Sequence, residues 1–136
     1  MNRPEDFGIK NYSWSPDGLL DVDGDVDLSN KELGKLPFNF GKVSGDFYCS
    51  YNKLETLEGA PKTVGGSFNC GDNKLESLQG APQEVGGYFD CRWNQLKTLE
   101  GAPKEVKGVI YVPKNLENQI PYYINVPHVI DYLFDD

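Results

Sequence analysis

The sequence predicts a repeat solenoid, in which similar short units stack along one axis. Three observations support this prediction. The 136 residues are enough for one domain. Similar stretches follow one another with a period of 21 residues, and the pattern degrades at both ends of the array. A unit of this length cannot bury its apolar side alone, so the units must stack to share a core.

The repeat is clearest in residues 57–78 and 78–99, which read LEGAPKTVGGSFNCGDNKLESL and LQGAPQEVGGYFDCRWNQLKTL. Equivalent positions carry Val43, Val64, Val85 and Val106, then Phe47, Phe68, Phe89 and Ile110, then Cys49, Cys70, Cys91 and Val112, and then Asn52, Asn73, Asn94 and Asn115. A degenerate unit that contains Val22, Val26 and Leu28 precedes them. Degenerate first and last units are typical of a stack whose ends must be capped.

Each part of the unit predicts a local structure. The G-x-F-x-C segment alternates apolar and polar residues, which predicts a short strand with Phe and Cys facing the core. Strands of adjacent units would pair in a parallel sheet about 4.8 Å apart. The Asn that follows can bond backbone groups of neighbouring coils. Gly-Ala-Pro turns the chain, and Gly-Gly permits a tight or positive-φ backbone before the strand.

The whole chain, residues 1–136, is expected to form one domain. Residues 1–21 would be an N-terminal cap, residues 22–112 the repeats, and residues 113–136 a C-terminal cap. In the first cap, SPDG at 15–18 predicts a turn between two short strands. In the second, Pro127 and the apolar pattern after it predict a short capping helix, the only helix expected. Its apolar residues would cover the last coil: Val129, Ile130, Leu133 and Phe134.

The F-x-C-x-x-N-x-L part of the unit fills the last four positions of the leucine-rich-repeat signature, as in Phe68, Cys70, Asn73 and Leu75. The chain therefore resembles leucine-rich-repeat proteins, with Val-Gly-Gly in place of the early Leu. The full L-x-G-A-P-x-x-V-G-G-x-F-x-C-x-x-N-x-L unit is similar to repeat proteins of large tailed bacteriophages, over about residues 22–120. The resemblance implies a protein-binding scaffold, and the phage resemblance implies an inhibitor or modulator of a bacterial host protein.

The net charge of -8 is confined to the ends of the chain, because residues 33–130 hold ten acidic and ten basic residues. This distribution argues against a nucleic-acid binder that acts through a basic field. No apolar run is long enough to span a membrane, and the acidic N-terminus does not resemble a signal peptide. Three cysteines cannot all pair, which favours a reducing compartment and hence the cytoplasm. An open solenoid end leaves self-association available.

Two clusters are candidates for metal binding, and one residue is a candidate for catalysis. The cysteines Cys49, Cys70 and Cys91 would stack on one another, but core packing is the ordinary role of such thiols. An acidic run has the spacing of a calcium loop but carries Val26 where that loop needs Gly; it comprises Asp21, Asp23, Asp25 and Asp27. The single histidine, His128, has no obvious catalytic companions, so we expect neither enzyme activity nor a cofactor.

The outward positions of the strand differ between units, whereas the scaffold positions hardly change. They carry aromatic residues beside acids, which is typical of a protein interface. The predicted partner-binding residues are Asp46, Tyr48, Tyr51, Asn69, Tyr88, Asp90, Arg92, Trp93 and Tyr111. Cross-strand stiffening of the sheet is the alternative role for the aromatics. The alternative functions are an acidic decoy of nucleic acid, which would use the acidic run, and calcium binding by the same run.

Overall fold

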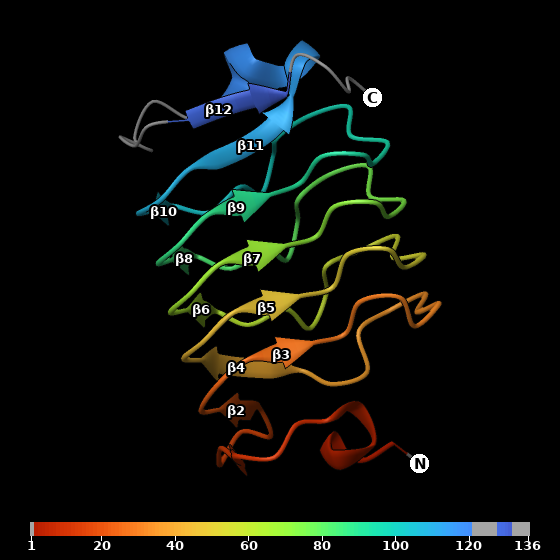
Figure 1. Ribbon diagram of the computed structural model, residues 1–136, viewed down its shortest axis with the longest axis vertical. Coiled ribbons are helices and arrows are strands. Elements are labelled where there is room, and N and C mark those ends of the chain that lie inside the picture. The colour runs from red at the N-terminus through yellow and green to blue at the C-terminus, as the bar shows by residue number, and fades with distance from the viewer. Residues whose placement is uncertain (1, 121–127, 132–136) are drawn as a thin grey trace.

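The computed structural model describes residues 2–120 and the backbone of residues 128–131. The chain is a parallel β-solenoid of about four turns, with one 21-residue repeat to each turn (Figure 1). Sheet A runs in the order β1 (Tyr12–Trp14), β2 (Leu20–Val22), β4 (Phe40–Val43), β6 (Thr63–Val64), β8 (Glu84–Val85) and β10 (Glu105–Val106). Sheet B runs in the order β3 (Val26–Asp27), β5 (Phe47–Tyr48), β7 (Phe68–Asn69), β9 (Phe89–Asp90), β11 (Ile110–Pro113) and β12 (His128–Asp131).

The register of sheet B follows the repeat. Phe47 pairs with Phe68, and Phe68 pairs with Phe89, so residues 21 apart lie side by side on parallel strands. This confirms the parallel strands predicted from the G-x-F-x-C segment. The parallel part of sheet A was not predicted. Its strands β6, β8 and β10 contain two residues each, just before the Gly-Gly or Lys-Gly pair of the unit, and two residues are too few for an alternation to be read.

The Gly-Gly pairs allow successive coils to approach closely. A Cβ atom on Gly65 would collide with the carbonyl oxygen of Ser44, and one on Gly86 would collide with that of Gly65. The pairs do not have positive φ angles. The positive angle occurs at the Gly of each Gly-Ala-Pro triplet, with φ of 94° at Gly59, Gly80 and Gly101. The sequence left two roles open for the Gly-Gly pairs, a tight backbone and a positive φ angle. The structure shows the first: the pairs permit close approach of neighbouring coils.

The core lies between the two sheets and the Leu-containing side of each coil. Phe47, Phe68 and Phe89 are fully buried and stack face to face, with ring centroids 5.4 and 5.6 Å apart. Cys49, Cys70 and Cys91 form a second buried row beside them. All three thiols are free, in agreement with the core role expected for them.

A row of asparagines joins the coils, as the sequence predicted. The Nδ2 group of Asn73 donates to the carbonyl oxygens of Cys49, Cys70 and Gly71 at 3.0, 3.1 and 3.2 Å. Its Oδ1 atom accepts the amide of Leu54 at 3.0 Å. Asn94 repeats the arrangement one coil later, with Cys70, Cys91 and Arg92 as acceptors and Leu75 as donor. Each asparagine thus satisfies backbone groups of its own coil and of the preceding one.

The N-terminal end of sheet A is closed by a hairpin. Strands β1 and β2 are antiparallel, and the turn at Ser15–Gly18 connects them as predicted. A short 3-10 helix, η1 (Pro4–Phe7), precedes the hairpin. Phe7 and Trp14 pack edge-on against Phe38, at centroid distances of 5.7 and 6.1 Å. β1 pairs with the outer side of β2, so the antiparallel β1 and not the first coil forms the edge of sheet A.

The prediction of a C-terminal capping helix is wrong for the part of that segment that the structure describes. Residues His128–Asp131 form β12, which pairs in parallel with β11. The β-branched Val129 and Ile130 favour a strand, and β11 offers its backbone groups to a further strand. A 3-10 helix lies earlier, in η2 (Lys114–Gln119). The other residues assigned to the capping helix, Leu133 and Phe134, lie outside the described residues.

Candidate functional site

The outer surface of sheet B carries two rows of side chains that alternate with the buried Phe row. One row contains Tyr48, Asn69, Asp90 and Tyr111, which are neighbours in register on β5, β7, β9 and β11. Asp27 on β3 begins this row, in register with Tyr48. The second row contains Asp46, Ser67 and Tyr88, which precede the same strands. The structure therefore brings six of the predicted partner-binding residues into these two rows, namely Asp46, Tyr48, Asn69, Tyr88, Asp90 and Tyr111.

Arg92 is the centre of a cluster of ionic and aromatic contacts on this face. It forms an ion pair with Asp90, with Nη2 2.8 Å from Oδ2 and Nε 3.0 Å from Oδ1. Its guanidinium lies 4.5 Å from the ring centroid of Trp93 and 4.4 Å from that of Tyr111. The carboxylate fixes the guanidinium plane, and the two rings hold it by cation–π attraction. Asp90 is only 5% exposed because Arg92 covers it.

The tyrosines extend this cluster toward the N-terminal coils. The rings of Tyr88 and Tyr111 meet edge to face, with centroids 5.7 Å apart. The hydroxyl of Tyr48 donates to Oδ2 of Asp46 at 3.1 Å. Burial, together with hydrogen bonds to Asp46 and Tyr88, raises the pKa of Tyr48. Tyr48 therefore stays neutral and remains a donor throughout the physiological pH range.

Four residues at one position of the coil have an unusual backbone. The φ angle is 57° at Asn30, 56° at Tyr51, 55° at Asp72 and 57° at Trp93. This left-handed conformation is unfavourable for residues other than Gly and Asn, and in the last three of these coils it directly precedes the Asn that recurs in the repeat. Tyr51 is 58% exposed, whereas Trp93 is half-buried beside Arg92. The sequence could not indicate this conformation, because the position does not carry glycine.

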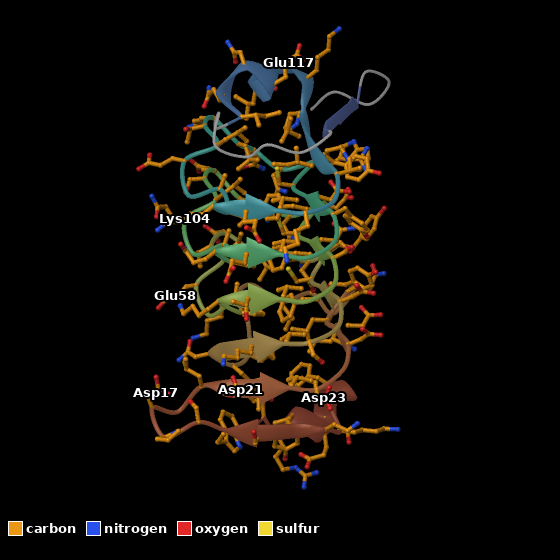
Figure 2. The ribbon with its side chains drawn as sticks, turned by 90° about the vertical axis from the view of Figure 1, so that its left-hand side faces the viewer. Asp17, Asp21, Asp23, Glu58, Lys104 and Glu117 are labelled. Atoms are coloured by element: carbon orange, nitrogen blue, oxygen red, sulfur yellow. The ribbon has the colours of Figure 1, made fainter. Side chains whose placement is uncertain are left out.

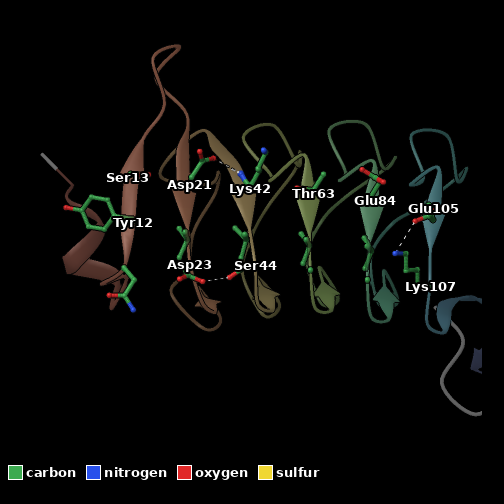
Figure 3. Close-up of a pocket in the computed structure, with 17 residues that line it drawn as sticks. Tyr12, Ser13, Asp21, Asp23, Lys42, Ser44, Thr63, Glu84, Glu105 and Lys107 are labelled. Carbon is green, nitrogen blue, oxygen red and sulfur yellow. Dashed lines mark hydrogen bonds and ion pairs between the residues drawn. The ribbon is translucent and has the colours of Figure 1, made fainter.

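The acidic run is divided between the two sheets. Asp21 lies in β2 of sheet A, and Asp23 directly follows that strand (Figure 2). Asp21 accepts the amide of Lys42 at 2.8 Å, and Asp23 accepts the Ser44 hydroxyl at 2.9 Å (Figure 3). Gly24, with φ of 128°, then turns the chain. Asp25 and Asp27 follow on the side of sheet B, where Asp25 accepts the Asp46 amide. Among the described residues no group of three or more His, Cys, Asp or Glu side chains could hold a metal ion.

A groove along the outer face of sheet A was not predicted. It has a volume of about 850 Å³ and runs across β1, β2, β4, β6, β8 and β10 (Figure 3). Gly65 and Gly86 leave its floor without side chains, and Lys42, Thr63, Glu84 and Glu105 line one side. The Gly-Gly pairs were the sequence signal for this groove. Because no strand was predicted before them, the sequence did not show that these glycines lie on the outer face of a sheet.

Burial decides the chemistry of the cysteines. It raises the pKa of Cys49 and of Cys70, each of which is enclosed in the core. For Cys70 the neighbouring Cys91 and Cys49 raise the pKa further. The reactive form of a cysteine is the thiolate, so these groups are unreactive in the folded protein.

The cysteines are therefore expected to react with a thiol reagent only after unfolding. The native protein should resist the reagent at pH 8, whereas the denatured chain should react at three positions. Because the native pKa values are raised, unfolding releases protons above the ordinary cysteine pKa of 9.0, and stability should decline as the pH rises beyond it. Rapid labelling of the native protein at pH 8 would contradict the buried arrangement.

These observations define the molecule as a parallel β-solenoid with a fixed, aromatic and acidic surface on sheet B. No protein-family model, curated protein or solved structure matches the chain. Within residues 2–120 and 128–131, no helix is long and apolar enough to cross a membrane.

Proposed function

We propose that the protein is a non-catalytic binding scaffold that recognises another protein through the outer face of sheet B. The observation that supports this most strongly is the cluster of Arg92, Trp93, Tyr111 and Tyr88. Tyrosine, tryptophan and arginine are the residues most enriched at binding hot spots. Here the neighbouring contacts already hold them in place, so a partner would lose little side-chain entropy on binding.

The backbone at Trp93 and Tyr51 also favours this function. A left-handed residue costs on the order of 1–2 kcal/mol when it is not glycine. Glycine would fit these positions without that cost, but the chain carries large aromatic side chains there. Strained residues of this kind cluster at functional sites. Asn30 and Asp72 share this conformation, so the coil itself imposes it, and what favours binding is that two of the four coils place a large aromatic side chain at this position.

The finer part of the proposal rests on sequence resemblance. The repeat unit is similar to leucine-rich repeats and to repeat proteins of large tailed bacteriophages. On this basis we propose that the partner is a bacterial host protein in the cytoplasm, and that binding inhibits or modulates it. Capture from a bacterial lysate followed by mass spectrometry would identify the partner.

Replacement of Trp93 or Tyr88 by alanine is expected to weaken partner binding at least about 30-fold, as is typical of hot-spot residues. The melting temperature should change little, because neither side chain belongs to the buried core. Binding is measured by titration against the identified partner. Gln79→Ala provides a control, since Gln79 is an exposed residue outside sheet B. Normal binding by both aromatic variants would remove the sheet B face from consideration.

A further inference from the structure

The Arg92 cluster shows which residues of this scaffold hold a guanidinium group. An aspartate stands in the outward row of sheet B, and a tyrosine stands at the same position one coil later, with Asp90 in register with Tyr111. The arginine follows the aspartate by two residues. The Oδ1 atom of Asp90 accepts the Arg92 amide at 3.1 Å, and the carboxylate also binds the guanidinium. The arrangement is an occupied arginine site within the chain.

The first coil repeats the aspartate and the tyrosine of this arrangement, but Ser29 and Asn30 replace Arg92 and Trp93. Asp27 is in register with Tyr48, as Asp90 is with Tyr111. The Oδ1 atom of Asp27 accepts the amide of Ser29 at 3.0 Å, which is the same bond that Asp90 makes to Arg92. In each case the carboxylate is therefore held by the amide two residues later. Serine replaces arginine, and its hydroxyl lies 3.3 Å from that of Ser50.

The difference in burial follows from the missing side chain and from the place of β3 at the sheet edge. Asp90 is buried beneath Arg92, whereas Asp27 is exposed. The only hydrogen bond that the described structure gives to the Asp27 carboxylate is that from Ser29 to Oδ1. Oδ2 is thus available to a donor from outside. Asp25 and Asp46 lie nearby in the other outward row and add negative charge.

We propose that the Asp27–Tyr48 pair, with Ser29 in place of the arginine, binds an arginine side chain of the partner protein. Asp27 would accept hydrogen bonds from the guanidinium, and Tyr48 would supply the aromatic surface, as Asp90 and Tyr111 do for Arg92. Lysine would bind less well, because its ammonium cannot make the two parallel bonds of a guanidinium. The inference rests on the proposed function for the origin of the arginine, but the site itself can be tested without the partner.

The probe is N-acetyl-arginine amide, compared with N-acetyl-citrulline amide, which has nearly the same shape but no charge. We expect the arginine probe to cause saturable shifts in the amide resonances of Asp27, Ser29 and Tyr48, and the citrulline probe to cause none. Asp27→Asn keeps the bond to the Ser29 amide and removes the charge, and it should weaken binding at least about fivefold. Asp25→Asn removes an equal charge from the other row and should change binding less than about twofold.

A second variant tests the comparison with the Arg92 cluster directly. In Ser29→Arg the introduced guanidinium should occupy the site as Arg92 does, and the saturable shifts should disappear while the spectrum remains that of a folded protein. Ser29→Ala should still bind the probe. No saturable shift, equal shifts from citrulline, or unchanged binding by Asp27→Asn would each overturn the site. If the arginine site fails these tests but Trp93→Ala still loses partner binding, the proposed function stands and only the arginine site is refuted. If the arginine probe binds but the protein has no protein partner, the proposed function is refuted and the arginine site stands.

Discussion

Replacement of Phe68 by alanine is expected to lower the free energy of unfolding by about 4 kcal/mol. Phe68 is fully buried in the middle coil, and its ring stacks on Phe47 and on Phe89 at centroid distances of 5.4 and 5.6 Å. Alanine would leave a cavity that the neighbouring rings cannot fill, because the hydrogen bonds of sheet B hold the coils in register. Urea denaturation followed by circular dichroism measures the change.

The matched control is Phe38→Ala. Phe38 is only half-buried and packs on the side of the first coils, so its loss should cost roughly half as much as that of Phe68. In a solenoid each coil contacts only its neighbours, and damage in the middle also separates the two halves of the stack. An equal loss in the two variants would show that the Phe row is not the main source of core stability.

Asn73→Ala is the second replacement with a large expected effect. It removes one acceptor and two donor hydrogens that serve Leu54, Cys49, Cys70 and Gly71. Leu54 is fully buried and its amide would lose the Asn73 oxygen. A buried polar group without a partner costs about 1–3 kcal/mol, so a total loss of about 3 kcal/mol is expected.

Asn69→Ala is the control for this variant. Asn69 lies four residues away on the outer row of sheet B, and its side chain accepts one bond, from the Gly71 amide at 2.9 Å. Its replacement should cost less than about 1 kcal/mol. The two variants are compared by the same urea titration. A loss below about 1 kcal/mol for Asn73→Ala would mean that water replaces the side-chain bonds, and that the asparagine row is not essential.

The fold was largely predictable because its determinants recur. Four equivalent Val, Phe or Ile, and Asn positions make the 21-residue period visible, and the period requires stacking. The inward direction of Phe68 and Cys70 follows from alternation alone. The parallel part of sheet A escaped prediction because strands β6, β8 and β10 contain only two residues each and are defined by pairing with other coils. β12 escaped for a similar reason, since Val129 and Ile130 form a strand only beside β11.

The candidate site was predictable as a face but not as a set of contacts. The outward position of Tyr48 and Asp90 follows from the strand pattern, and the repeat places them on neighbouring coils. The burial of Asp90 under Arg92 does not follow, because it depends on two aromatic rings from different coils. For the acidic run, the sequence suggested a single cluster that the structure does not contain. The run is continuous in the sequence, but the turn at Gly24 separates Asp23 from Asp25 onto different sheets.

The amino-acid sequence by itself determined the period, the parallel register of the Phe row and the role of the buried asparagines, because each depends on local alternation repeated at a constant interval. Tertiary structure alone decided that there are two sheets, that the chain ends its described part in a strand, and that Arg92 is already bound whereas Asp27 is available. These depend on which side chains from separate coils meet across a coil spacing of about 4.8 Å. A linear pattern specifies the position of each residue in its coil, but the contacts between coils specify which groups remain free for a partner.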